Sequence, residues 1–234
     1  MNSIILSCPT LKKELLAAMR EYGCHTPVMF MPRELHSDPQ YLHTYVQDKI
    51  DRLYNIDHII ICTSGCGGGT IGLKASTAEL IIPRTRDCLD ILLSDQSLKT
   101  LKRNYKGVFF TDSWLEFMKN SSLDLDRLEA EKGKEGAVSF IRKLYGSINQ
   151  FYIINTGCYD MAPVRAYVDR MVKILNGTVE EIPGSYGILK KMAANHFDED
   201  FLIVPKGGQV PENFVFPISD SAQELEGFDD ETKR

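Results

Sequence analysis

The sequence predicts a doubly wound α/β fold with a mostly parallel sheet, and three observations lead to that prediction. Short apolar runs alternate with helical stretches along the 234 residues, the order that crossover helices between parallel strands produce. The strongest run, residues 58–62, is apolar without alternation, as in a strand buried on both faces. A composition with 43% hydrophobic and 25% charged residues is typical of a globular chain with its own core.

In the first half, strands are expected where apolar residues cluster, and helices where apolar positions recur every three or four residues. We expect strands over residues 3–7, 27–31, 58–62 and 79–83, and helices over residues 10–22 and 39–54. Ser37 or Asp38 is the expected N-cap of the second helix.

The second half repeats this rhythm less regularly. We expect strands over residues 107–111, 151–155, 178–182 and 201–205, and helices over 124–144, 163–176 and near 187–196. The expected organisation is one domain over residues 1–215, with two similar lobes at about 1–100 and 101–215 as a subdivision. The acidic segment 216–234 lacks a core pattern and is expected to be poorly ordered.

Charge and hydropathy exclude several classes of protein. The net charge of −5 argues against a nucleic-acid-binding surface, which is normally basic. The sequence has no apolar run near the length of about 20 residues that spans a bilayer, and its first residues lack a secretory signal pattern. We therefore expect a cytoplasmic protein without a membrane partner, whose cysteines are thiols or metal ligands rather than disulfides.

Cysteines gather at the predicted carboxyl ends of the strands, where open α/β sheets bind ligands. Five of the six follow a predicted strand, and Cys24 is the exception; the five are Cys8, Cys62, Cys66, Cys88 and Cys158. If the strands are neighbours, Cys8, Cys66 and Cys88 converge from three loops. Three thiolates suit zinc with a fourth ligand, or a [4Fe–4S] cluster with one iron open to substrate. Buried cysteines that only fill the core remain the alternative.

The loop after residue 62 combines a thiol with glycines. Gly67, Gly68 and Gly69 allow close backbone approach to a ligand. A helix that began near Thr70 would direct its free N–H groups at an anion and would lower the pKa of Cys66. The loop matches neither common nucleotide-binding motif, so the alternative is a tight turn between strand and helix.

Other candidate ligand residues occupy loops on the same predicted edge. His36 follows the second strand and could ligate a metal or transfer a proton. Arg84 and Arg86 flank Cys88 and could hold a carboxylate or phosphate. Tyr186 lies in a glycine-bounded turn after another strand. For each of these residues the alternative is a solvated loop.

An ordered set of motifs resembles a known family. The segments are ILSCPTLKKEL, PRELHSDPQ, CTSGCGGGTIGL, IPRTRDCLDILL, GVFFTDSWLEF, GSYGIL and IVPKGGQV. Together they resemble the family named domain of unknown function 1638 over roughly residues 3–210. The order and spacing of the motifs carry the resemblance, since none is specific alone.

The resemblance implies a site made of Cys8, His36, Cys66 and Cys88, with the Gly67–Gly69 loop and Tyr186 nearby. Two flanking positions depart from the family pattern, because Asp87 replaces a histidine and Gly65 replaces an acidic residue. Family members often occur in anaerobes beside corrinoid-dependent methyl-transfer systems. This context implies an oxygen-sensitive cluster or a zinc-thiolate site, with a corrinoid protein or a methyltransferase as partner.

Three functions follow as hypotheses. The first is a metal-dependent enzyme, a transferase or lyase, in which Cys66 and His36 serve the chemistry and a small anionic or methylated molecule is the substrate. The second is a carrier or accessory protein for a metal, a corrinoid or a methyl group, without catalysis. The third is a metal-free thiol enzyme with Cys66 as nucleophile, which requires a depressed pKa at Cys66.

Overall fold

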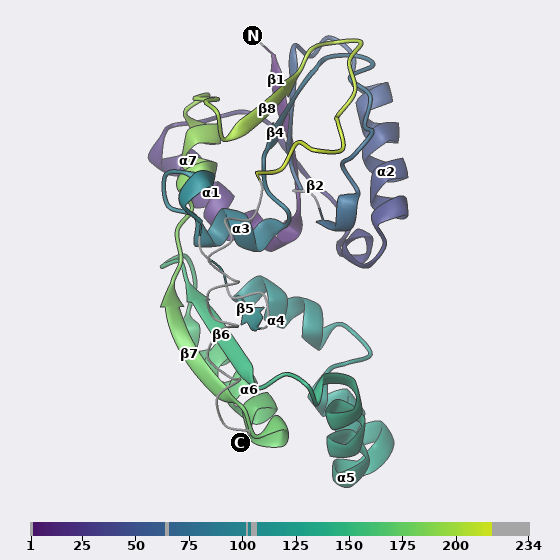
Figure 1. The fold of residues 1–234 in the computed structure, drawn as a ribbon, viewed down its shortest axis with the longest axis vertical. Coiled ribbons are helices and arrows are strands. Elements are labelled where there is room, and N and C mark those ends of the chain that lie inside the picture. The colour runs from purple at the N-terminus through teal and green to yellow at the C-terminus, as the bar shows by residue number, and fades with distance from the viewer. Residues whose placement is uncertain (1, 64–65, 102, 104–106, 217–234) are drawn as a thin grey trace, which may run out of the picture.

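The computed structural model describes residues 2–63, 66–101, 103 and 107–216, and the fold is a mostly parallel, doubly wound α/β fold (Figure 1). Within these residues the strands form a five-stranded sheet in the order β2-β1-β3-β4-β8 and a three-stranded sheet in the order β5-β6-β7. Each sheet and its helices are called a lobe below, the larger and the smaller. The fold class predicted from the sequence is therefore confirmed.

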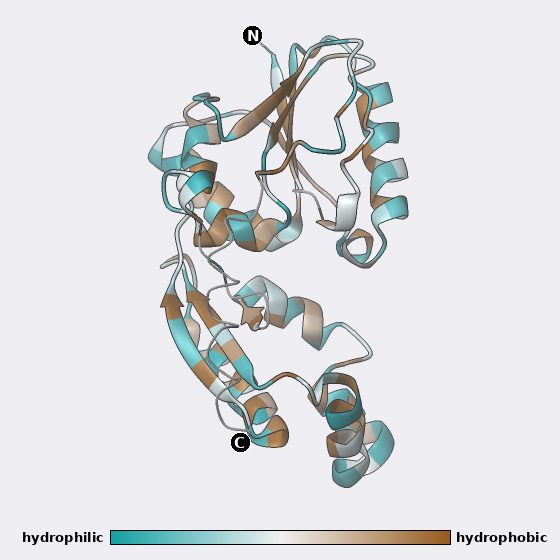
Figure 2. Cartoon of the chain, in the orientation of Figure 1, coloured by the Kyte–Doolittle hydropathy of each residue, from teal (hydrophilic) through white to brown (hydrophobic). Residues whose placement is uncertain are grey.

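The larger sheet has parallel strands with one antiparallel edge. Its strands are β1 (Ser3–Ser7), β2 (Val28–Phe30), β3 (His58–Cys62), β4 (Glu79–Pro83) and β8 (Phe201–Val204). The register pairs Ser7 with Cys62, whereas β8 runs antiparallel to β4. Figure 2 shows the central strands as hydrophobic, which agrees with burial on both faces.

Helices cover both faces of the larger sheet. One face packs against α1 (Lys12–Glu21), α3 (Cys88–Leu93) and α7 (Gly187–Ala193), and the other against α2 (Pro39–Arg52). Asp38 is the N-cap of α2 and accepts hydrogen bonds from the N–H groups of Gln40 and Tyr41. Alternate positions along each strand face the two cores, as the pleat requires.

The smaller sheet is parallel throughout and carries its helices on one face. It comprises β5 (Val108–Phe110), β6 (Gln150–Asn155) and β7 (Thr178–Pro183), with α4 (Asp112–Lys119), α5 (Leu125–Tyr145) and α6 (Met161–Leu175). The other face supplies Phe109 and Ile154 to the buried cluster around α1, α3 and α7. This shared core fixes one lobe against the other.

The two sheets direct their carboxyl ends toward each other. The arrows of β6 and β7 point at the larger lobe in Figure 1. At the contact, the Thr156 hydroxyl after β6 donates a 2.7 Å hydrogen bond to Glu14 of α1. The carboxyl ends of the parallel strands, where open α/β sheets bind ligands, therefore meet in one region.

Some sequence expectations need correction. α3 and α4 were not expected, and α5 is broken at Gly133, which has φ 67°. No helix in the described ranges has the length and apolar character needed to cross a membrane. The predicted disorder of the tail after residue 216 concerns residues outside those described, and the division into domains stays a prediction.

A cysteine-lined candidate site between the lobes

Three neighbouring strands bring three cysteines to one edge of the larger sheet. Cys8 follows β1, and its N–H donates to the Cys62 carbonyl at 3.0 Å. Cys66 lies in the loop after β3, and Cys88 is the first residue of α3 beyond β4. The sequence placed Cys88 in a loop, but Asp87 caps a short helix there by accepting from the N–H groups of Leu89 and Asp90.

The thiols of Cys8, Cys66 and Cys88 lie within electrostatic reach of one another. Burial is the largest cause that raises the pKa of each thiol. Ionised Cys8 would raise the pKa of Cys66 further, and ionised Cys8 or Cys66 would raise that of Cys88. An ionised Cys8 therefore disfavours ionisation of the other two thiols.

Two of the three thiols make polar contacts with neighbouring residues. Cys8 Sγ lies 2.9 Å from Thr10 Oγ1, and Cys66 Sγ donates to the Thr63 carbonyl at 2.8 Å. Among the described residues, no group of three or more His, Cys, Asp or Glu side chains has an arrangement that would hold a metal ion as it stands. The donor type fits zinc or an iron–sulfur cluster, but binding would require Cys8 and Cys66 to leave these hydrogen bonds.

The glycine loop is fixed by packing against α2 rather than by a following helix. Cys66 has φ 29° and Gly67 has φ 69°. A Cβ at Gly67 would lie 2.8 Å from Pro39 Cγ, and one at Gly69 would lie 2.8 Å from Leu42 Cδ2. The expected helix near Thr70 is absent from this described stretch, which forms turns. The predicted lowering of the Cys66 pKa by such a helix is therefore wrong, and burial raises that pKa instead.

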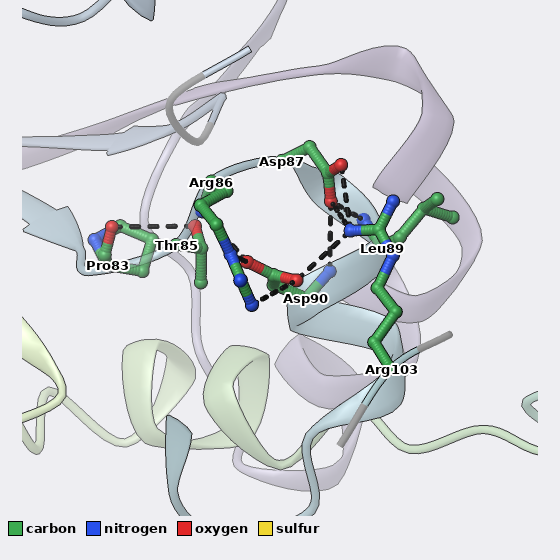
Figure 3. A network of polar contacts seen from close by, with 7 residues as sticks. All are labelled: Pro83, Thr85, Arg86, Asp87, Leu89, Asp90 and Arg103. Carbon is green, nitrogen blue, oxygen red and sulfur yellow. Dashed lines mark hydrogen bonds and ion pairs between the residues drawn. The ribbon is translucent and has the colours of Figure 1, made fainter. Parts of the chain in front are cut away.

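A partly buried ionic network includes residues on both sides of Cys88 in the chain (Figure 3). Asp90 is almost wholly buried and accepts from Arg86 Nε at 2.8 Å and from Arg103 Nη1 at 3.1 Å. Arg103 also donates to Asp87 at 2.7 Å. Because Arg86 and Arg103 pair with these carboxylates, the network anchors the start of α3 and so the position of Cys88.

A small pocket opens beside Cys8 and Cys66, at the contact between the lobes. The larger lobe contributes both thiols, Met31 and Arg33, and α4 of the smaller lobe contributes Trp114 and Phe117. The two aromatic rings meet edge to face at 5.1 Å. The free volume is about 20 Å³, which is room for about one water-sized group.

Ion pairs hold α4 over this pocket. Arg33 pairs with Glu116 and its Nη1 lies 3.4 Å from the Ser113 carbonyl. Lys13 of α1 pairs with Asp112 at the start of α4. These contacts join the two lobes across the pocket.

The other predicted site residues do not gather at the pocket. Arg84 donates to the Phe214 carbonyl at 2.9 Å, Arg86 pairs with Asp90, and Thr70 is fully buried beside the glycine loop. Tyr186 contacts Cys158. Burial raises the pKa of Cys158, and the Tyr186 hydroxyl lowers it by a smaller amount. His36 lies in a 3-10 turn after β2, and its side chain is outside what the structure describes.

The sequence analysis missed the pocket's cation and its aromatic wall. Arg33 is in the quoted segment PRELHSDPQ, two residues before Leu35, which also lines the pocket. Trp114 and Phe117 are three residues apart, a helical spacing that was available in DSWLEF. The recognisable signal was an uncommon cluster of aromatic residues just after a predicted strand.

The sequence matches the model of a known protein family. The family model described as "Protein of unknown function (DUF1638)" matches residues 30–193, more than half of the chain. The chain belongs to this family. In this DUF1638 protein the matched region contains Cys66, Cys88 and Tyr186, whereas Cys8 precedes it. No curated protein and no solved structure matches the chain.

Proposed function

We propose that the chain is a cysteine-ligated metal-binding enzyme that acts on a small anionic or methylated molecule. The observation that supports this proposal most is that Cys8, Cys66 and Cys88 follow three neighbouring strands at one edge of the larger sheet, with Cys8 and Cys66 lining a pocket. Three protein ligands leave a coordination position for substrate, as catalytic zinc sites and clusters with an open iron do. His36 is the candidate fourth ligand.

The electrostatics of the thiols favour a cation. Ionised Cys8 raises the pKa of Cys66 and of Cys88, and ionised Cys66 raises that of Cys88, so three thiolates together need a compensating positive charge. A bound metal ion supplies that charge and deprotonates coordinating thiols. When bound, zinc or a [4Fe–4S] cluster would supply Lewis acidity. The chain's own residues would hold the metal, and burial would exclude water from it.

A carrier function is the second candidate. The pocket has room for about one water-sized group, which fits storage of a metal as well as it fits catalysis. A corrinoid protein or methyltransferase would then be the partner, as the family's context implies. A tightly held metal without turnover on methyl donors would favour this candidate.

A metal-free enzyme that uses Cys66 receives less support. Such an enzyme needs a thiol with a lowered pKa, whereas burial and the neighbouring thiols raise the pKa of Cys66. We therefore rank this function below the two metal-dependent ones.

The test is the metal content of protein purified without oxygen, compared between the wild type, Cys66→Ser and Cys158→Ser. Cys158 serves as control because it follows β6 of the other sheet. We expect about one zinc per chain, or about four iron with absorption near about 400 nm, lost in Cys66→Ser and kept in Cys158→Ser. Absence of metal from wild type and control would overturn the proposal.

A further inference from the structure

The arginine that lines the pocket between the lobes is paired with a carboxylate of the chain itself. Glu116 of α4 pairs with Arg33, the cation of the larger lobe that lines the pocket. The same helix carries Trp114 and Phe117, which form the pocket's aromatic wall. When Glu116 is paired with Arg33, the same helix therefore holds Trp114 and Phe117 against the pocket.

The lining of the pocket defines the kind of molecule that fits. Apart from Arg33, the thiols and two threonines, the wall is apolar and includes Met31, Leu35, Trp114 and Phe117. Arg33 and the thiol-bearing residues Cys8 and Cys66 line the same pocket. A molecule that uses all these groups has one carboxylate for Arg33 and a short apolar body for the aromatic rings.

The size of the pocket shows that α4 must move before such a molecule binds. About 20 Å³ of free volume accepts about one water-sized group, less than a short acid needs. The Arg33–Glu116 pair is partly exposed, with the two side chains 33% and 53% accessible. An exposed pair of this kind is weak, so a competing carboxylate can displace Glu116.

We propose that the pocket binds a short-chain carboxylate, whose carboxylate group takes the place of Glu116 on Arg33 and displaces α4. The body of the acid then lies between Met31, Trp114 and Phe117, beside the thiols of Cys8 and Cys66. This inference rests on the proposed function, since it names the substrate class of the same site. Glu116 acts as a built-in competitor of the ligand.

Trp114 provides the readout because it is the single tryptophan of the chain. We would titrate sodium butyrate at constant ionic strength and follow the fluorescence of Trp114 in the wild type, Glu116→Gln, Arg33→Gln and Arg33→Lys. Glu180→Gln, an exposed position on β7, is the matched control. Butanol tests binding of the apolar body without the carboxylate, and circular dichroism checks that each variant is folded.

The expected result is saturable binding that becomes about 2- to 5-fold tighter in Glu116→Gln, because a weak internal competitor is removed. Arg33→Gln should lose binding by about 10-fold or more, Arg33→Lys should lose less, and Glu180→Gln should match the wild type. Equal binding by folded Arg33→Gln, tight binding of butanol, or no saturable change in Glu116→Gln would overturn the inference.

Metal content distinguishes this inference from the proposed function. Neither Arg33 nor Glu116 is a proposed metal ligand, so both variants should keep the metal of the wild type. Metal without butyrate binding would overturn only the carboxylate pocket. Butyrate binding without metal in any sample would overturn only the metal site.

Discussion

At the residue scale, Glu14 is an ionisable side chain that is buried rather than exposed to solvent. Its side chain is almost wholly buried where the lobes meet, and Oε2 has no hydrogen-bond partner among the described residues. Burial raises the pKa of Glu14, and the charge of Asp112 adds to the increase, while the hydrogen bond from Thr156 opposes it. An ionised carboxylate in this position is therefore costly to the folded state.

The pH dependence of stability follows from that pKa. The folded-state pKa of Glu14 lies above the ordinary value of 4.5, so stability present at low pH is lost as pH rises through the folded pKa. Glu14→Gln cannot ionise and avoids this loss. We expect the free energy of unfolding of Glu14→Gln, minus that of the wild type, to grow between about pH 4 and pH 8.

Urea unfolding at the two pH values measures this difference. Glu180→Gln is the control, because that exposed carboxylate on β7 should show no comparable change. A difference that is the same at both pH values would show that burial does not perturb Glu14. The amide side chain of the Glu14→Gln variant can also change the free energy of unfolding by an amount that does not depend on pH. That amount is the same at both pH values and cancels in the comparison.

The residue scale also shows what the sequence could predict of the site. The position of Cys8, Cys66 and Cys88 at one edge of the larger sheet could be predicted from strand order, since neighbouring parallel strands end at one edge. The direction of the Cys66 pKa could not be predicted, because it depends on burial and on neighbouring sulfurs. Arg33 and its partner Glu116 are 83 residues apart in the chain, so only the tertiary structure reveals their pair.

At the scale of elements, the strands were predictable and the short helices were not. The apolar runs marked all eight described strands to within one or two residues. α3 has six residues and α4 has eight, too few for a clear helical period. The break in α5 at Gly133, with φ 67°, interrupts a pattern that reads as one helix.

The glycine loop provides a test at this scale. Ala at Gly67 would combine φ 69° with a Cβ 2.8 Å from Pro39 Cγ, whereas Gly23 has φ 60° and open space around it. Both substitutions incur backbone strain, and only Gly67→Ala adds a clash. We expect Gly67→Ala to destabilise the protein by about 1–3 kcal/mol more than Gly23→Ala does.

Chemical denaturation of the two variants measures this. Equal destabilisation would mean that packing against Pro39 does not constrain the loop. If the loop positions Cys66 for metal binding, metal affinity should also fall in Gly67→Ala and stay unchanged in Gly23→Ala. Both readouts come from the same purified samples.

At the scale of the whole molecule, two lobes share a core and are joined by ion pairs around the pocket. Phe109 and Ile154 tie the smaller sheet to the larger lobe, and Lys13–Asp112 and Arg33–Glu116 join α4 to it. The core contact is apolar and independent of salt, whereas the ion pairs are screened. Salt should therefore loosen α4 without separating the lobes.

Loosening of α4 can be measured through Trp114. Lys13→Gln removes the partner of Asp112, and we expect the acrylamide quenching constant of Trp114 to rise about twofold while the free energy of unfolding falls by about 1–3 kcal/mol, because the buried Asp112 loses its cation. Lys143→Gln, on the exposed side of α5, is the control. No difference between the two variants would show that this ion pair does not hold α4.

X-ray absorption at the metal edge of anaerobically purified protein tests whether Cys8, Cys66 and Cys88 bind one metal. We expect about three sulfur neighbours per metal at about 2.3 Å for zinc, or an iron–sulfur cluster spectrum. In Cys88→Ser the number of sulfur neighbours should fall or the metal should be lost. A metal surrounded only by nitrogen and oxygen, with the same spectrum in Cys88→Ser, would contradict the claim.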